Sequence, residues 1–159
     1  MKALFLIPVL ALSACEAMMV PASAPATGPA AASAPVAPSA TLDPTPPPPP
    51  PAAAVTVDDF DTTTAEDKAE ALAVTAPAAA ALGTTLVSLG SPADPGIWLK
   101  TPLVSELTPG RVAYGGNEAN VELRPSGGVV GSGSEMSLPA MRVLEIPLTE
   151  IAEVTVSRR

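Results

Sequence analysis

A long proline-rich stretch limits where this 159-residue chain can fold. From Pro21 to Pro51 the sequence is almost entirely proline, alanine, serine and threonine, and it ends in six consecutive prolines. Such a segment cannot bury enough apolar surface to offset the entropy that ordering it would cost. We therefore predict that residues 15–57 form a disordered linker, stiffened by its polyproline run. We interpret it as a spacer or stalk, and a docking site for a proline-binding module is the alternative.

The N-terminus has the pattern of a bacterial lipoprotein signal. A single basic residue, Lys2, precedes an apolar run from Ala3 to Leu12, and the tetrad Leu12-Ser13-Ala14-Cys15 follows. We predict that residues 1–14 are a signal peptide and that the cysteine is lipidated, with palmitate among its acyl chains. The run is shorter than the roughly 20 residues of a membrane-spanning helix, and Pro8 interrupts it. An ordinary secretory signal, cut at a later small residue, is the alternative.

The predicted anchor implies a location in the cell envelope. A lipid on Cys15 would hold the chain at a membrane, facing the periplasm. The next residue, Glu16, is not the aspartate that retains lipoproteins in the inner membrane of enteric bacteria. This difference favours the outer membrane over the inner one.

Composition narrows the chemistry that the chain can carry. The formal net charge is −8, and nucleic acid is then not an expected partner, because phosphate binding needs a basic face. The sequence has no histidine and only one cysteine, so it cannot form an intramolecular disulfide. Histidine is also the commonest general base and metal ligand. We therefore expect no cofactor, no metal site and no catalytic residue.

Residues 58–76 interrupt the low-complexity sequence with an acidic segment. Thr63 and Glu66 have the spacing of a capping box, and they predict a short helix from about Ala65 to Thr75, ending before Pro77. Alone, such a helix would be marginal. Three interpretations stay open for the segment. It docks on the following domain through Leu72 and Val74, it docks on a partner through Phe60, or it frays between linkers. Residues 77–81 are predicted to be a second linker.

Residues 82–159 are the predicted folded domain, and their patterns are mostly those of strands. An alternating strand with Val121 and Leu123 inward and a glycine-bounded turn predict a hairpin over residues 111–124. Ser137 as N-cap and Pro139 in the first turn predict one short helix over residues 137–144. The expected strands are 84–89, 97–101 with a continuation at 103–104, 111–114, 120–124 and 151–156. The predicted fold class is mostly β: a small six-stranded barrel with one short helix.

The glycine-rich loop between Ser126 and Ser134 is predicted to be a connector. It lacks the Gly-Lys-Ser/Thr end of a phosphate-binding P-loop, and no long helix follows it. A dinucleotide site would need a βαβ unit, which the patterns do not predict.

Three stretches resemble a group of short alphaproteobacterial lipoproteins whose role is not established. They are the acidic segment 58–67, the stretch 83–90 (Gly-Thr-Thr-Leu-Val-Ser-Leu-Gly) and the stretch 98–104 (Trp-Leu-Lys-Thr-Pro-Leu-Val). Such chains are sometimes given the name D-galactarate dehydratase. That enzyme is large, metal-dependent and cytoplasmic, so we do not expect its activity in this short, exported, histidine-free chain.

The order of elements over the last 50 residues resembles the double-psi β-barrel of rare lipoprotein A, a peptidoglycan-associated protein. The stretches that carry the resemblance are Gly110-Arg111-Val112, the strand 121–124, Glu135-Met136-Ser137-Leu138 and the stretch 148–156. Active members of that family have an aspartate just after the strand, where this chain has Pro125-Ser126-Gly127. Lytic chemistry needs a carboxylic acid, so the resemblance implies a double-psi-like barrel that is catalytically inert.

The sequence therefore favours a lipid-anchored envelope protein whose domain binds peptidoglycan or an envelope protein. Aromatic rings could stack on sugars, and cationic side chains could meet carboxylates. The candidate contacts are Trp98, Lys100, Arg111, Tyr114 and Arg124, although Trp98 is more simply a core or rim residue. The alternative is an enzyme, either a divergent glycan lyase or the dehydratase. Its candidate acids would be Asp94, Glu106, Glu118 and Glu122. A third hypothesis is a structural tether made of the lipid and stalk alone.

Overall fold

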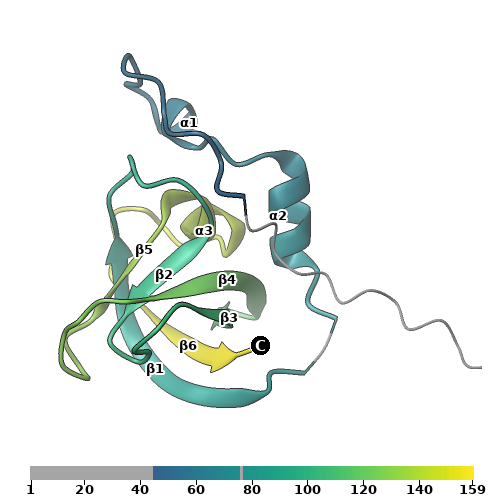
Figure 1. The fold of residues 1–159 in the computed structure, drawn as a ribbon, viewed down its shortest axis with the longest axis vertical. Coiled ribbons are helices and arrows are strands. Elements are labelled where there is room, and N and C mark those ends of the chain that lie inside the picture. Colours follow the sequence, from purple (N-terminus) through teal and green to yellow (C-terminus); the bar gives the residue numbers. More distant parts are fainter. Residues whose placement is uncertain (1–44, 76) are drawn as a thin grey trace, which may run out of the picture. The chain divides into compact units, whose positions relative to one another are not determined.

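The structure is a computed structural model that describes residues 45–75 and 77–159, all within one compact unit. Cys15, the signal peptide and most of the predicted linker lie outside the described residues. Nine helices and strands are described (Figure 1). They are α1 (Val57–Phe60), α2 (Ala65–Leu72), β1 (Ala80–Leu89), β2 (Trp98–Thr101), β3 (Thr108–Tyr114), β4 (Asn117–Pro125), β5 (Ser134–Met136), α3 (Leu138–Val143) and β6 (Ala152–Arg158).

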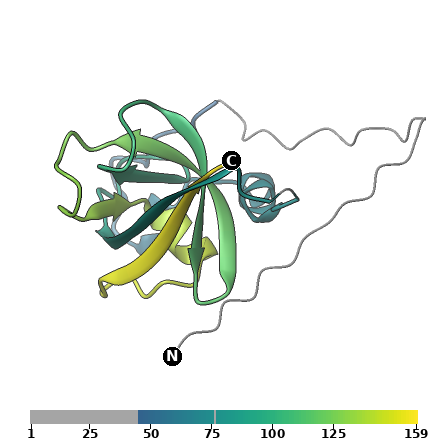
Figure 2. The same cartoon turned by 90° about the horizontal axis from the view of Figure 1, so that it is seen from below.

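The six strands close into a barrel, which confirms the predicted fold class. Their order around the barrel is β1-β5-β2-β4-β3-β6. The pairs β1–β5 and β2–β4 are parallel, and the other four neighbouring pairs are antiparallel. Figure 2, seen from below, shows the strands wrapped around a common interior with α2 outside them. A closed barrel leaves no unpaired sheet edge.

Alternating side chains fill the barrel interior. Val121 and Leu123 of β4 are fully buried, as predicted, and so are Val112 of β3 and Val156 of β6. Successive residues of a strand point to opposite faces, so alternate apolar positions meet at the centre. Leu99 also points inward, whereas Lys100 is exposed.

The predicted hairpin is formed by β3 and β4. They pair antiparallel from Thr108 opposite Leu123 to Tyr114 opposite Asn117. The two-residue turn consists of Gly115 and Gly116, with φ of 57° and 97°. Positive φ at both central residues is the requirement of the hairpin turn that matches strand twist.

The strand β5 was not predicted, and the predicted continuation at residues 103–104 is wrong. Leu103 forms a turn with Pro102 and Val104 lies outside any strand, whereas Ser134–Met136 joins the barrel between β1 and β2. Three residues are too few to show a periodic pattern. The helix α3 confirms the sequence prediction. The Ser137 hydroxyl caps it by accepting from the backbone N–H of Ala140, and Pro139 lies in its first turn.

The residues before the barrel are part of the same folded unit. We call residues 45–75 the N-terminal belt. The helix α2 starts at Ala65 as predicted, but its cap is Thr64 with Asp67 rather than Thr63 with Glu66, and it ends at Leu72. It packs against β4 through the fully buried Ala71. Leu72, expected at that contact, is 52% exposed.

The predicted linkers also differ from the structure at their folded ends. Within the proline run, Pro47 and Pro50 are half-buried while the neighbouring prolines are exposed. This spacing of three is the repeat of a polyproline II helix that lies along a surface. The strand β1 begins at Ala80, inside the segment expected to be the second linker. No helix in the described part of the chain is long and apolar enough to cross a membrane.

Candidate functional site

A groove lies between the N-terminal belt and one end of the barrel. Its volume is about 460 Å³. The belt supplies Pro46 and Pro47 on one side and a face of α2 on the other, while the barrel supplies the loops before β2 and β3 and part of β4. The lining residues are Thr45, Pro46, Pro47, Thr63, Asp67, Glu70, Pro95, Gly96, Ile97, Leu107, Thr108, Pro109, Glu122, Arg124 and Arg159. Most of the barrel-side contribution is therefore apolar or proline.

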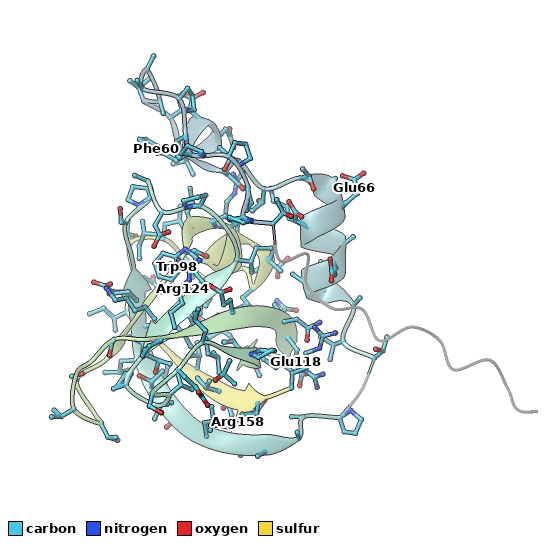
Figure 3. All side chains as sticks on the ribbon, in the orientation of Figure 1. Phe60, Glu66, Trp98, Glu118, Arg124 and Arg158 are labelled. Carbon is cyan, nitrogen blue, oxygen red and sulfur yellow. The ribbon has the colours of Figure 1, made fainter. Side chains whose placement is uncertain are left out.

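Arg124 organises the barrel side of the groove. Its Nη1 lies 3.1 Å from both carboxylate oxygens of Asp94, and its Nε donates to Glu122 Oε1 at 2.5 Å. The guanidinium also lies over the Trp98 ring, 5.1 Å from its centroid, and Figure 3 shows the two side chains together. Cation–π contact and paired carboxylates hold the guanidinium in place. This cluster fixes the loop before β2 against β4.

Trp98 is a core residue rather than an open stacking platform. Its side chain is 1% exposed, and its indole N–H donates to the backbone oxygen of Asp94 at 3.2 Å. A Cβ added at Gly90 would lie 2.6 Å from the Trp98 ring, so the ring needs a glycine beside it. The expected stacking of Trp98 on a sugar ring is therefore not supported, because the residues around it cover its faces.

The other predicted contact residues do not gather at one place. Lys100 is exposed on β2 and lies 3.7 Å from Glu135. Arg111 is buried on β3, with its Nη1 3.7 Å from Glu118. Tyr114 is half-buried at the hairpin end of β3 and packs against the core. Of the five predicted contacts, the groove is lined only by Arg124, and Trp98 supports it from beneath.

The four acids considered for an enzyme are also dispersed. Asp94 and Glu122 converge on Arg124, Glu118 pairs with Arg111, and Glu106 is exposed before β3. The first two hold the loop before β2 in place as ion-pair partners. The described residues contain no group of three or more aspartates, glutamates, histidines or cysteines that could hold a metal ion.

The sequence analysis missed Asp61, which ties the belt to the barrel domain. Its side chain is 2% exposed and accepts from Lys68 Nζ at 2.8 Å, from Arg142 Nη1 at 3.0 Å and from the Thr63 hydroxyl. Burial acts to raise the Asp61 pKa, but the hydrogen bonds from Lys68 and Thr63 and the charges of Lys68 and Arg142 outweigh it, so the pKa lies below the usual value for aspartate. Arg142 is 81 positions away, and no local pattern signals such a pair.

Asn120 and Glu70 form a second link between the belt and the barrel, and the sequence analysis missed both. Asn120 is fully buried on β4, and its amide donates to the backbone oxygens of Glu70 and Ala73 at 3.4 Å and 3.2 Å. These carbonyls belong to the C-terminal end of α2, where helices leave acceptors without partners. Glu70 itself lines the groove, and its Oε1 is shielded from solvent without a hydrogen-bond partner in the described structure.

A second cavity, of about 550 Å³, lies under the glycine-rich loop. Its walls include Leu86, Lys100, Ser134 and Ile151. Leu86 and Ile151 are 55% and 70% exposed. The connector predicted for residues 126–134 is therefore a loop that borders this cavity together with β1 and leads into β5.

Together, the fold and the groove describe a small closed β-barrel with a helical belt and a mainly apolar, partly acidic binding groove. Comparisons with family models, with curated proteins and with solved structures found no match to this chain.

Proposed function

We propose that this protein is a lipid-anchored lipoprotein of the bacterial cell envelope, and that its barrel is a non-catalytic module that binds another envelope protein. The anchor follows from the tetrad that ends at Cys15, and Glu16 favours the outer membrane. The chain would then face the periplasm, attached through its acyl chains.

The groove is the observation that carries the binding role. Ligands usually bind to proteins in concave, mainly apolar clefts that carry a few polar groups and have volumes of about 300–1,000 Å³. None of the described residues that line this groove is aromatic. Sugar recognition relies on exposed rings, whereas Trp98 is buried, so a protein partner is better supported than a glycan strand.

Labelling tests the anchor. Cells that express the full chain are grown with labelled palmitate, and the Cys15→Ala variant is expected to lose the label. The matched control, Ser23→Ala, keeps the cysteine and is expected to keep the label. Persistent labelling of Cys15→Ala would overturn the anchor.

Crosslinking in cells tests the binding role. A photoreactive amino acid replaces Leu107, which is 65% exposed on the groove, or Val129, which is 77% exposed on the glycine-rich loop and serves as the control. We expect one envelope protein, identified by mass spectrometry, to crosslink at position 107 and not at position 129. Adducts with peptidoglycan alone, or none, would contradict the proposed partner class. Soluble muropeptides released by the purified chain would contradict the non-catalytic role.

A further inference from the structure

We infer that the groove receives a short apolar peptide segment carrying a lysine or arginine side chain, supplied by the partner protein. This inference rests on the proposed binding function and names the chemistry of the segment that is bound.

The apolar part of the argument starts from Leu107. This leucine lines the groove together with Ile97 and Pro109 and is 65% exposed. Covering exposed apolar surface on binding is favourable because it removes that surface from water. A ligand with aliphatic side chains would cover Leu107, and the groove volume suits a few side chains rather than a folded domain.

The charged part of the argument concerns the face of α2 that borders the groove. Asp67 and Glu70 are three residues apart and lie on the same side of the helix. Glu66, on the same helix, points away from the barrel (Figure 3). The Glu70 Oε1 atom is shielded from water and accepts no hydrogen bond. A carboxylate oxygen in that state lacks the donor that would offset its desolvation. Because Glu70 lines the groove, a rotation of its side chain would let an ammonium or guanidinium group of a ligand supply that donor.

The basic residues of the groove do not cancel this preference. Arg124 is already paired with Asp94 and Glu122. Arg159 also lines the groove, as do the two acids of α2. With Arg124 and Glu122 paired, the remaining charged residues of the lining are Asp67, Glu70 and Arg159, so the groove keeps an excess of negative charge and favours a cation over an anion.

The chain itself cannot supply that cation easily. Residues 16–44 contain no lysine or arginine, so the rest of the predicted stalk lacks the required side chain. A second copy would bring a formal charge of −8 towards an acidic surface. The charge pattern therefore points to a different protein as the source of the segment.

Peptide titration of the full chain in detergent micelles tests the inference. The probes are the capped pentapeptide Leu-Pro-Lys-Pro-Leu and the same peptide with glutamate in place of lysine. Trp98 is the only tryptophan, so its single indole N–H resonance and its fluorescence report on the groove through Arg124 and Gly96. We expect saturable binding of the lysine peptide, and about tenfold weaker binding of the glutamate peptide.

Two pairs of variants separate specific binding from general effects. We expect Glu70→Gln to weaken binding of the lysine peptide about tenfold, and Glu66→Gln to leave its affinity unchanged. We expect Leu107→Ser to weaken binding of both peptides about fivefold, and Val129→Ser to change the affinity of neither peptide. Equal binding of the two peptides, no binding, or equal effects of Glu70→Gln and Glu66→Gln would overturn the inference. If the crosslink from position 107 to an envelope protein persists in that case, the proposed function stands and only the peptide chemistry fails.

Discussion

Asn120 shows how much one buried amide contributes to this fold. It lies on β4 with no exposed surface, and it donates to two carbonyls at the end of α2. In Asn120→Asp a carboxylate would face those carbonyls without donating to them. We expect the variant to lose about 3 kcal/mol of unfolding free energy near neutral pH, measured by urea denaturation.

The pH dependence of Asn120→Asp provides the check on this mechanism. Burial raises the pKa of the new carboxyl above that of unfolded aspartate. The loss should therefore be smallest at acid pH, where the carboxyl is protonated in both states, and grow as the pH rises. Asn120→Ala, which removes the amide without adding an acid, serves as the control, and its cost should not depend on pH. If the cost of Asn120→Asp also stayed constant with pH, that would contradict the explanation.

The pH dependence expected for Asp61 has the opposite sign to that of Asn120→Asp. Its pKa is lowered in the folded state, so its contribution is present above the pKa of unfolded aspartate and is lost as the pH falls through the folded value. We expect Asp61→Asn to cost about 2 kcal/mol near neutral pH, because charge-assisted hydrogen bonds from Lys68 and Arg142 are weakened.

The cost of Asp61→Asn should shrink on acidification, as followed by urea denaturation across the acid range. Asp59 is a suitable control because its pKa is also lowered, by hydrogen bonds from the side chain and backbone of Thr56 and the backbone of Val55, but it lies exposed in α1. Asp59→Asn should have a much smaller effect on stability. Equal effects of the two substitutions would show that the link to Arg142 contributes nothing.

The burial of a residue could be predicted where it depends on neighbours in the chain, and its contacts could not be predicted where they come from distant parts of the sequence. Alternation along one strand predicted that Val121 and Leu123 are buried, because neighbours in the chain determine which face a residue occupies. The same alternation cannot assign Asn120 to the end of a helix 50 positions earlier. Strand alternation places Trp98 and Leu99 on opposite faces of β2, yet both are buried, because the loop around Asp94 covers the outer side of β2.

At the level of elements, the β3–β4 turn offers a matched pair of substitutions. Gly115 has a φ of 57°, which asparagine adopts readily, whereas Gly116 has a φ of 97°. A Cβ at either position meets no atom within 4 Å, so only the backbone conformation distinguishes them. We expect Gly115→Asn to change the unfolding free energy by less than about 0.5 kcal/mol, and Gly116→Asn to lower it by about 1 kcal/mol. Urea denaturation of both variants measures the difference, and the reverse order would contradict the turn type.

Elements with strong local signals were predicted, and those defined by partners were not. The hairpin and α3 have glycine and serine signals at their ends, so their type followed from the sequence. The strand β5 has three residues and exists because β1 and β2 supply hydrogen bonds on both sides. The groove was not predicted for the same reason, since it forms only where the belt meets the barrel.

At the scale of the whole molecule, the folded unit starts well before the barrel. The belt buries Ala71, satisfies the Asn120 amide and pairs Asp61 with Arg142. A barrel of about 80 residues has little stability to spare. We therefore expect a chain starting at Thr45 to be as stable as the full chain, and a chain starting at Ala80 to be less stable by about 4 kcal/mol in urea denaturation.

A thermodynamic cycle distinguishes belt docking from a general effect of truncation. In the longer chain Asn120→Ala removes the donor to the carbonyls of α2 and should cost about 2 kcal/mol. In the chain starting at Ala80 those carbonyls are gone and α2 no longer covers Asn120, so its amide bonds to water and the same substitution should cost almost nothing. The difference between the two costs is the coupling between Asn120 and the belt. If Asn120→Ala costs the same in both chains, α2 does not stabilise the barrel through this residue.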